Sequence, residues 1–312
     1  MPSETKKDAP TPASKTAPPA PPGAPRPARA PAELLDDSIA SLERAVAQQD
    51  DRLLRSFLRQ AVVFRRRLET PDLARAIRKY LPTHTPNRAF LLAALASLPV
   101  VPVVGVVKKK EDDVAAEAVS AMDIDVSDKA ASASASARTT VLPELEIFFH
   151  LLVLSRCIGA ARGREAKEGG GMLLSCVESA TMLLARLGSF SRHTLDLIGS
   201  KVYILFSLVH ELTGREAFAS IRPALFRAYR TACLRRDDMG RATLVNLLLR
   251  NFIAFDMYEQ AGKLLDSIPE QFPSAVSNNQ FVRHLYYVGR VHAVNCEYGE
   301  AHQRLNVVGL CF

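Results

Sequence analysis

The sequence lacks the features by which an enzyme, a secreted protein or a β protein is usually detected. It contains no GxSxG, GxxxxGK[ST], HExxH or GxGxxG motif, so the common nucleophile, phosphate, zinc and dinucleotide sites are not predicted. No segment alternates convincingly between apolar and polar residues, which argues against a sheet. The start has no basic stretch followed by an apolar core, so no secretory signal is expected. We predict a protein that is not an enzyme and holds no cofactor.

Cysteine is scarce and irregularly placed. The chain has 5 cysteines, an odd number, and none lies in a CxxC arrangement. This distribution predicts reduced, mostly buried thiols in an intracellular protein. His292 and Cys296 are four apart on one helical face, with His302 and Cys311 downstream, but this spacing matches no common zinc template. We therefore predict no metal site.

Basic residues exceed acidic ones. There are 40 lysines and arginines against 33 acids, a formal charge of +7, so acidic partners are expected. Nucleic acid, an anionic membrane surface and an acidic peptide satisfy this charge equally well. Arginines gather between residues 52 and 79, but no aromatic residues are interleaved for base stacking, which favours a solvated helix face over a nucleic-acid patch.

Composition divides the chain into four parts. Residues 1–33 are a tail rich in proline and alanine, because ten of the 19 prolines fall within the first 31 positions. Residues 34–99 have helical periodicity, with a start at Leu34 and a second helix over about Asp51 to Leu68. Residues 100–140 are a low-complexity linker containing an acidic run and the ASASASA repeat. Residues 141–312 are helical almost throughout.

The apolar run from Ala89 to Val107 resembles a membrane span, since it is uncharged and precedes three lysines. Pro99, Pro102 and Gly105 interrupt its second half, where a lone spanning helix would have to satisfy its own backbone. The pattern favours a short helix from Asn87 to Leu98 followed by an extended connector. We predict no membrane association.

The part from 141 onward is organised around the segment Arg241 to Phe255. Asp237 or Asp238 is expected to cap this helix, which is apolar on nearly every side except for a stripe of Thr243, Asn246 and Arg250. Such a helix must be packed by neighbours on most faces. Single helices are predicted over Arg215–Arg235 before it and Gln280–Cys296 after it, and a flexible loop is predicted at 169–171.

A weak repeat runs through these helices. A short turn with an acid or amide is followed by alanine at positions 166, 217, 261 and 301, with spacings of 51, 44 and 40. A small residue there lets the second helix of a hairpin sit close to the first, and Tyr258 and Tyr298 are expected to fill the corners. The predicted fold is therefore all-α, an irregular tetratricopeptide-like solenoid of helical hairpins.

Four segments resemble a known family. They are RTACLRRDDMGRATLVNLLLRNFIAFDMYEQAGKLL (230–265), NNQFVRHLYYVGRVHAVNCEYGEA (278–301), LPELEIFFHLLVL (142–154) and RAFLLAALASLP (88–99). The first resembles the central region of the non-ATPase regulatory subunit 3 family of the 26S proteasome lid, which belongs to the larger group of PCI-domain subunits. The resemblance covers most of 34–99 and 142–306.

This resemblance implies a non-catalytic scaffold in ubiquitin-dependent protein degradation, located in the cytoplasm and nucleus. Its implied partners are other proteasome lid subunits and a small, acidic, largely disordered lid subunit. The family solenoid is followed by a winged-helix PCI module, which this sequence does not contain. Its last residues, 307–312, look unlike the family's continuation. We interpret the sequence as C-terminally truncated or as an incomplete gene model.

The basic residues of the solenoid supply the candidate partner-binding site. As a hypothesis, some of six arginines line its concave surface and pair with carboxylates of an acidic peptide: Arg235, Arg236, Arg241, Arg250, Arg283 and Arg290. For each one alone, solvation or intramolecular pairing is the competing interpretation. A helical-repeat scaffold of a translation or mRNA-export complex, associated with nucleic acid, is the alternative function, although a nucleic-acid partner is not expected here.

Overall fold

The computed structural model describes residues 31–65, 68–83, 85–98, 142–162, 166–268 and 276–310, and all regular structure within these ranges is helical. The first group of helices is α1 (Pro31–Gln48), α2 (Asp51–Phe64), α3 (Thr70–Tyr80) and α4 (Pro86–Ala96). The second group is α6 (Pro143–Arg162), α7 (Ala166–Gly188), the 3₁₀ turn η1 (His193–Leu195), α8 (Asp196–Thr213), α9 (Arg215–Ser220), α10 (Arg222–Arg235), α11 (Asp238–Ala254), α12 (Tyr258–Asp266), α13 (Asn278–Val294) and α14 (Tyr298–Leu310).

The predicted linker and most of the predicted tail lie outside the described residues. Helix α1 begins at Pro31, so the last residues assigned to the tail are helical. Proline is favourable in a first helical turn, where its missing N–H would have no partner. Leu35, Ile39 and Leu42 of α1 are buried, as the helical periodicity predicts.

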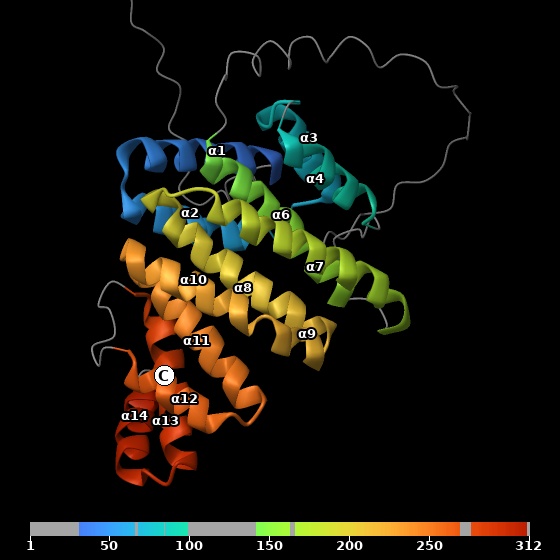
Figure 1. The fold of residues 1–312 in the computed structure, drawn as a ribbon. Coiled ribbons are helices and arrows are strands. Elements are labelled where there is room, and N and C mark those ends of the chain that lie inside the picture. Colours follow the sequence, from blue (N-terminus) through green and yellow to red (C-terminus); the bar gives the residue numbers. More distant parts are fainter. Residues whose placement is uncertain are drawn as a thin grey trace, which may run out of the picture.

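The helices stack in an order close to that of the chain. Figure 1 shows a row that runs from α1–α4 at one end to α12–α14 at the other. Neighbours in sequence pack together, as in the pairs α6–α7, α7–α8, α10–α11 and α13–α14, while α2–α8 and α4–α6 join the first group to the second. One hydrophobic core follows the stack from α1 to α13. The predicted all-α solenoid of helical hairpins is confirmed.

Helix α11 lies in the middle of the second group and is covered on most sides. It contacts α8, α10, α12 and α13, and buries Leu244, Leu248 and Leu249 completely. The Asp237 side chain caps it by accepting a hydrogen bond of 2.7 Å from the Gly240 amide. Both the all-round burial and the cap agree with the sequence pattern.

Two predicted elements differ in the structure. Positions 169–171 belong to α7 and do not form the predicted loop, because a long apolar helix can outweigh the modest helix penalty of each glycine. The predicted helix Arg215–Arg235 is divided at Ile221 into α9 and α10. Pro223 lies in the first turn of α10, where it is tolerated, whereas inside a continuous helix it would remove a hydrogen bond.

The repeat alanines are only partly in equivalent positions. Ala261 and Ala301 are buried, as close packing of hairpins requires, and Ala217 is half-buried. Tyr258 is half-buried against the core, but Tyr298 is 68% exposed and does not fill a corner. The corner role predicted for Tyr298 is therefore wrong.

One described helical window, Gly171–Gly188 in α7, is long and apolar enough to cross a membrane by length and composition. This helix packs against α6 and α8, and 28% of the window is buried. The apolar run that begins at Ala89 forms helix only to Ala96, and its part from position 99 onward lies outside the described residues.

Candidate partner-binding surface

The polar stripe of α11, Thr243, Asn246 and Arg250, contacts α13 through Asn246. Asn246 Nδ2 donates to the Gln280 carbonyl oxygen at 2.9 Å and to Gln280 Oε1 at 2.8 Å. Asn246 and Thr243 are almost completely buried, at 3% and 1% exposure. Two of the three stripe residues are thus buried, Asn246 against α13, and Arg250 alone reaches the surface.

A shallow depression of ≈ 240 Å³ lies where α8, α11 and α13 meet. Its apolar part comes from Ile204, Leu247 and Tyr287, and its polar lining comes from Thr243, Asn246, Arg250, Gln280 and Arg283. We call this feature the basic depression. Arg250 Nη2 forms an ion pair of 2.7 Å with Glu211 Oε1, so its charge is partly neutralised. Arg283 is exposed.

Two further cations lie near this depression. Lys201 is on the exposed side of α8, one turn before Ile204, and Arg65 follows the end of α2, which packs against α8. Partial burial lowers the pKa of Lys201, and the charges of Arg283 and Arg65 lower it further. Three elements distant in sequence therefore bring positive charge to one place.

The other four predicted arginines lie elsewhere. Arg235 borders a second depression with Asp196 and Asp237, and Arg236 ends α10 in a left-handed conformation with φ 57°. Arg241 forms an ion pair of 3.3 Å with Asp238 one turn away. A hydrogen bond with Tyr258 is the main cause that raises the pKa of Arg290. The structure thus brings together Arg250 and Arg283 of the six.

The second depression contains the cap of α11. Desolvation raises the pKa of Asp237 to about 6, and the hydrogen bond from the Gly240 amide opposes this shift. Burial also raises the pKa of Asp196, while a contact with His193 lowers it. Asp237 is 6% exposed, and its observed role is to begin α11.

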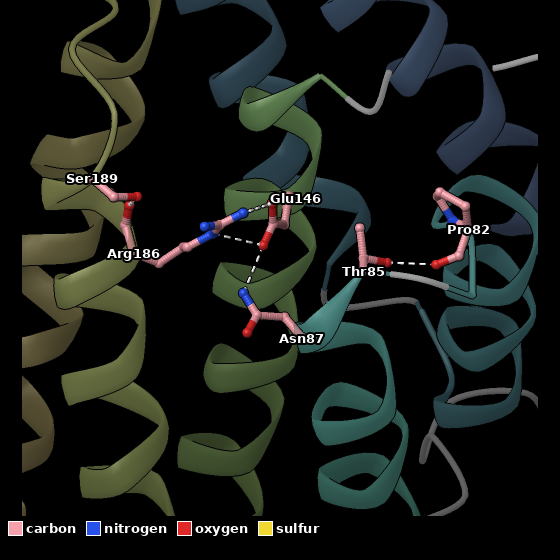
Figure 2. A network of polar contacts seen from close by, with 6 residues as sticks. All are labelled: Pro82, Thr85, Asn87, Glu146, Arg186 and Ser189. Carbon is pink, nitrogen blue, oxygen red and sulfur yellow. Dashed lines mark hydrogen bonds and ion pairs between the residues drawn. The ribbon is translucent and has the colours of Figure 1, made fainter. Parts of the chain in front are cut away.

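Buried carboxylates at the other end of the stack are held by cations. Glu146 of α6 accepts hydrogen bonds of 3.0 and 3.1 Å from Arg186 of α7 and one of 2.6 Å from Asn87 of α4. Figure 2 shows the Arg186 fork and the Asn87 amide both pointing at this carboxylate, the first from the left and the second from below. Glu144 is held similarly by Arg192 and Thr194. These groups join helices and are occupied by protein partners.

One serine–histidine contact resembles a catalytic pair only superficially. His150 Nε2 lies 3.1 Å from Ser179 Oγ, between α6 and α7. The two residues are 1% and 3% exposed, and His150 Nδ1 has no hydrogen-bond partner among the described residues. A nucleophile needs a substrate path and an oriented base, so this arrangement is a packed polar contact.

Lys201 and Arg65 were missed by the sequence analysis. Arg65 begins a run of three arginines, from which no local pattern distinguishes it, whereas Lys201 is an isolated cation in an apolar segment. Their significance depends on the packing of α2 and α13 beside α8. The one available signal was the apolar face of α8, which places Lys201 at its solvent edge.

Comparisons with known proteins give a consistent result. A family model described as "PSMD3-like, N-terminal TPR repeats" matches residues 30–308. The chain is 32% identical over 271 residues to the 26S proteasome non-ATPase regulatory subunit 3 of Dictyostelium discoideum, an alignment that covers 86% of this chain and 47% of the relative.

Relatives in plants and animals show the same similarity. The probable 26S proteasome non-ATPase regulatory subunit 3 of Nicotiana tabacum is 34% identical over 237 residues, covering 76% of this chain and 45% of the relative. The corresponding probable subunit of Drosophila melanogaster is 40% identical over 164 residues, covering 53% of this chain and 30% of the relative. The chain spans about half the length of the curated relatives it matches, or less.

Proposed function

Because the chain belongs to the PSMD3-like family of proteasome regulatory subunits, we propose that it is a non-catalytic scaffold subunit of the 26S proteasome lid. In this role it supports assembly of the regulatory particle and ubiquitin-dependent protein degradation in the cytoplasm and nucleus. The observation that carries the proposal is the family match across 30–308, which includes nearly all described helices. A stack of hairpins offers the extended surface that such a scaffold needs.

Co-purification tests this proposal. The tagged chain is expressed in cells, isolated at low salt, and its associated proteins are quantified with and without nuclease treatment. We expect lid subunits to be enriched equally in both samples. Absence of lid subunits, or retention only of nuclease-sensitive partners, would contradict the lid proposal, and the second result would support the alternative of a nucleic-acid-associated scaffold.

We further propose that other lid subunits and a small acidic lid subunit are its partners, and that the acidic one meets the basic depression. The support is that Arg250 and Arg283 border one depression with an apolar part, which suits a segment with alternating acidic and apolar side chains.

Arg283→Glu tests this contact, with Arg230→Glu on the exposed side of α10 as the matched control. Affinity for the small acidic subunit is measured at two salt concentrations. We expect Arg283→Glu to weaken binding and to reduce its salt dependence, because one screened charge contact is lost. Equal affinity for the two variants would contradict the contact.

A further inference from the structure

Three cations beside the basic depression lack a carboxylate partner within the described part of the chain. Arg65, Lys201 and Arg283 come from the end of α2, from α8 and from α13, and no ion pair among the described residues neutralises them. Arg250 differs, since Glu211 holds it at 2.7 Å. The local charge is therefore positive by several units, which is unfavourable unless an anion is bound.

A buried hydroxyl in the lining of the same depression also lacks a partner among the described residues. Thr243 is 1% exposed, and its Oγ1 makes no hydrogen bond to any residue that the structure describes. A threonine within a helix commonly donates to a carbonyl of the preceding turn. An unpaired buried hydroxyl is unfavourable, and an oxygen atom entering the depression would give it an acceptor after a small shift of the rim side chains.

We propose that the basic depression binds a phosphate group carried by a phosphorylated side chain of an acidic partner segment. Arg283 donates to phosphate oxygens from the rim, Lys201 and Arg65 add positive charge beside it, and Thr243 Oγ1 donates from the lining. This inference rests on the proposed acidic partner and specifies the group that it presents.

The charge balance favours phosphate over a carboxylate. A carboxylate carries one charge, so several acidic side chains would each have to reach a different one of the three cations. A phosphate monoester carries a charge near −2 and three acceptor oxygens, so several donors can bind it at once. The planar fork of an arginine matches two of those oxygens, and the ammonium group of a lysine adds a compact charge.

Two synthetic peptides test the proposal directly. Both have the same acidic sequence with a few apolar residues, and they differ in one central position, serine or phosphoserine. Their dissociation constants for the full chain are measured at about 0.15 M ionic strength, where screening extends over about 8 Å. We expect the phosphopeptide to bind at least about tenfold more tightly, because it adds charge-assisted hydrogen bonds.

Variants assign the effect to the depression. Lys201→Gln and Arg283→Gln should each bring the ratio of the two affinities close to one, whereas Arg230→Gln should leave it unchanged. Thr243→Val should weaken phosphopeptide binding while raising the unfolding temperature, since it removes an unpaired buried hydroxyl at nearly constant shape. A thermal unfolding curve for every variant shows that the fold is retained.

The outcomes separate this inference from the proposed function. Equal affinity for the two peptides overturns the phosphate site, and so does a ratio of the two affinities that is unchanged in both Lys201→Gln and Arg283→Gln. Neither result contradicts an acidic partner. Failure of both peptides to bind overturns the acidic surface as well, and co-purification with lid subunits is scored independently. Inorganic phosphate should compete only at far higher concentrations. If it binds as tightly as the phosphopeptide, the free anion is the ligand and a phosphorylated partner segment is excluded.

Discussion

At the scale of single residues, His150 couples stability to pH. Burial lowers the pKa of His150 to about 4 from an ordinary value of 6.5, so the folded state holds the ring neutral. The folded chain therefore binds fewer protons than the unfolded chain between these values. Stability from this residue is complete above about pH 6.5 and is lost as pH falls toward 4.

We predict that His150→Gln reduces this acid sensitivity. Wild-type protein should lose about 2 kcal/mol more unfolding free energy than the variant when pH falls from about 7 to about 5. Urea unfolding at both pH values measures the difference, and the exposed His302→Gln is the control. Identical pH dependence of His150→Gln and wild type would contradict the assignment. Other titrating groups, such as Asp237, are common to both proteins and cancel.

Asn246 is the residue that fixes α11 to α13. Its amide makes two bonds to Gln280 within an interface that is almost closed to solvent. We predict that Asn246→Ala lowers the unfolding free energy by about 2 kcal/mol, since it leaves a buried carbonyl without its donor. Chemical denaturation measures this loss. Asn306→Ala, at an exposed position of α14, should change stability by less than about 0.5 kcal/mol.

At the scale of helices, two glycines should respond to alanine in opposite directions. A Cβ at Gly240 would lie 1.9 Å from Asp237 Oδ2, whereas a Cβ at Gly159 would meet nothing within 4 Å. Gly240→Ala should destabilise by about 1–3 kcal/mol, because the capping side chain must leave its buried position. Gly159→Ala should stabilise by about 0.5–1 kcal/mol, as alanine does within a helix. Two shifts of the same sign in thermal unfolding would contradict this explanation.

The helices themselves could largely be predicted from sequence where pattern and cap agree. Helix α11 combines an apolar surface on nearly every side with Asp237 before it, and both signals are local. The glycines of α7 misled the prediction because a local helix penalty was weighed without the packing of α6 and α8. The break at Ile221 could have been predicted, since Pro223 restricts the conformation of the residue before it.

The candidate site was less predictable than the fold. Arg250 and Arg283 were found because they lie on helices whose mutual contact the pattern implied. Lys201 and Arg65 were not found, since their proximity depends on α2 packing against α8 across a long separation in sequence. The sequence also could not show that Asn246 is bound by Gln280 of α13 or that Thr243 is buried. Tertiary packing, which no local pattern records, decided all four.

At the scale of the whole molecule, Glu146 joins the N-terminal helices to the rest of the stack. Its carboxylate is shared by Arg186 of α7 and Asn87 of α4, so three elements depend on it (Figure 2). We predict that Glu146→Ala destabilises the protein by about 3 kcal/mol, because a partly buried cation and a buried amide lose their acceptor.

Hydrogen exchange locates this effect. Amides of α3 and α4 should lose more protection in Glu146→Ala than those of α11, because α4 loses a direct contact with α6. The exposed Glu178→Ala in α7 is the matched control and should leave the exchange pattern unchanged. A uniform loss of protection across all helices would show that the Glu146 contacts act on the entire molecule at once.

The packing of each helix against its neighbours in sequence bears on how the chain is made in the cell. Helix α6 packs against α7, α7 against α8 and α10 against α11. Such contacts between neighbours in sequence close short loops, so their formation costs little conformational entropy. Each hairpin can therefore complete its main interface soon after its second helix leaves the ribosome, and it then serves as a surface for the next. Synthesis and folding then proceed in the same direction. The basic depression forms only after α8 and α13 have emerged, although Arg65 is synthesised earlier.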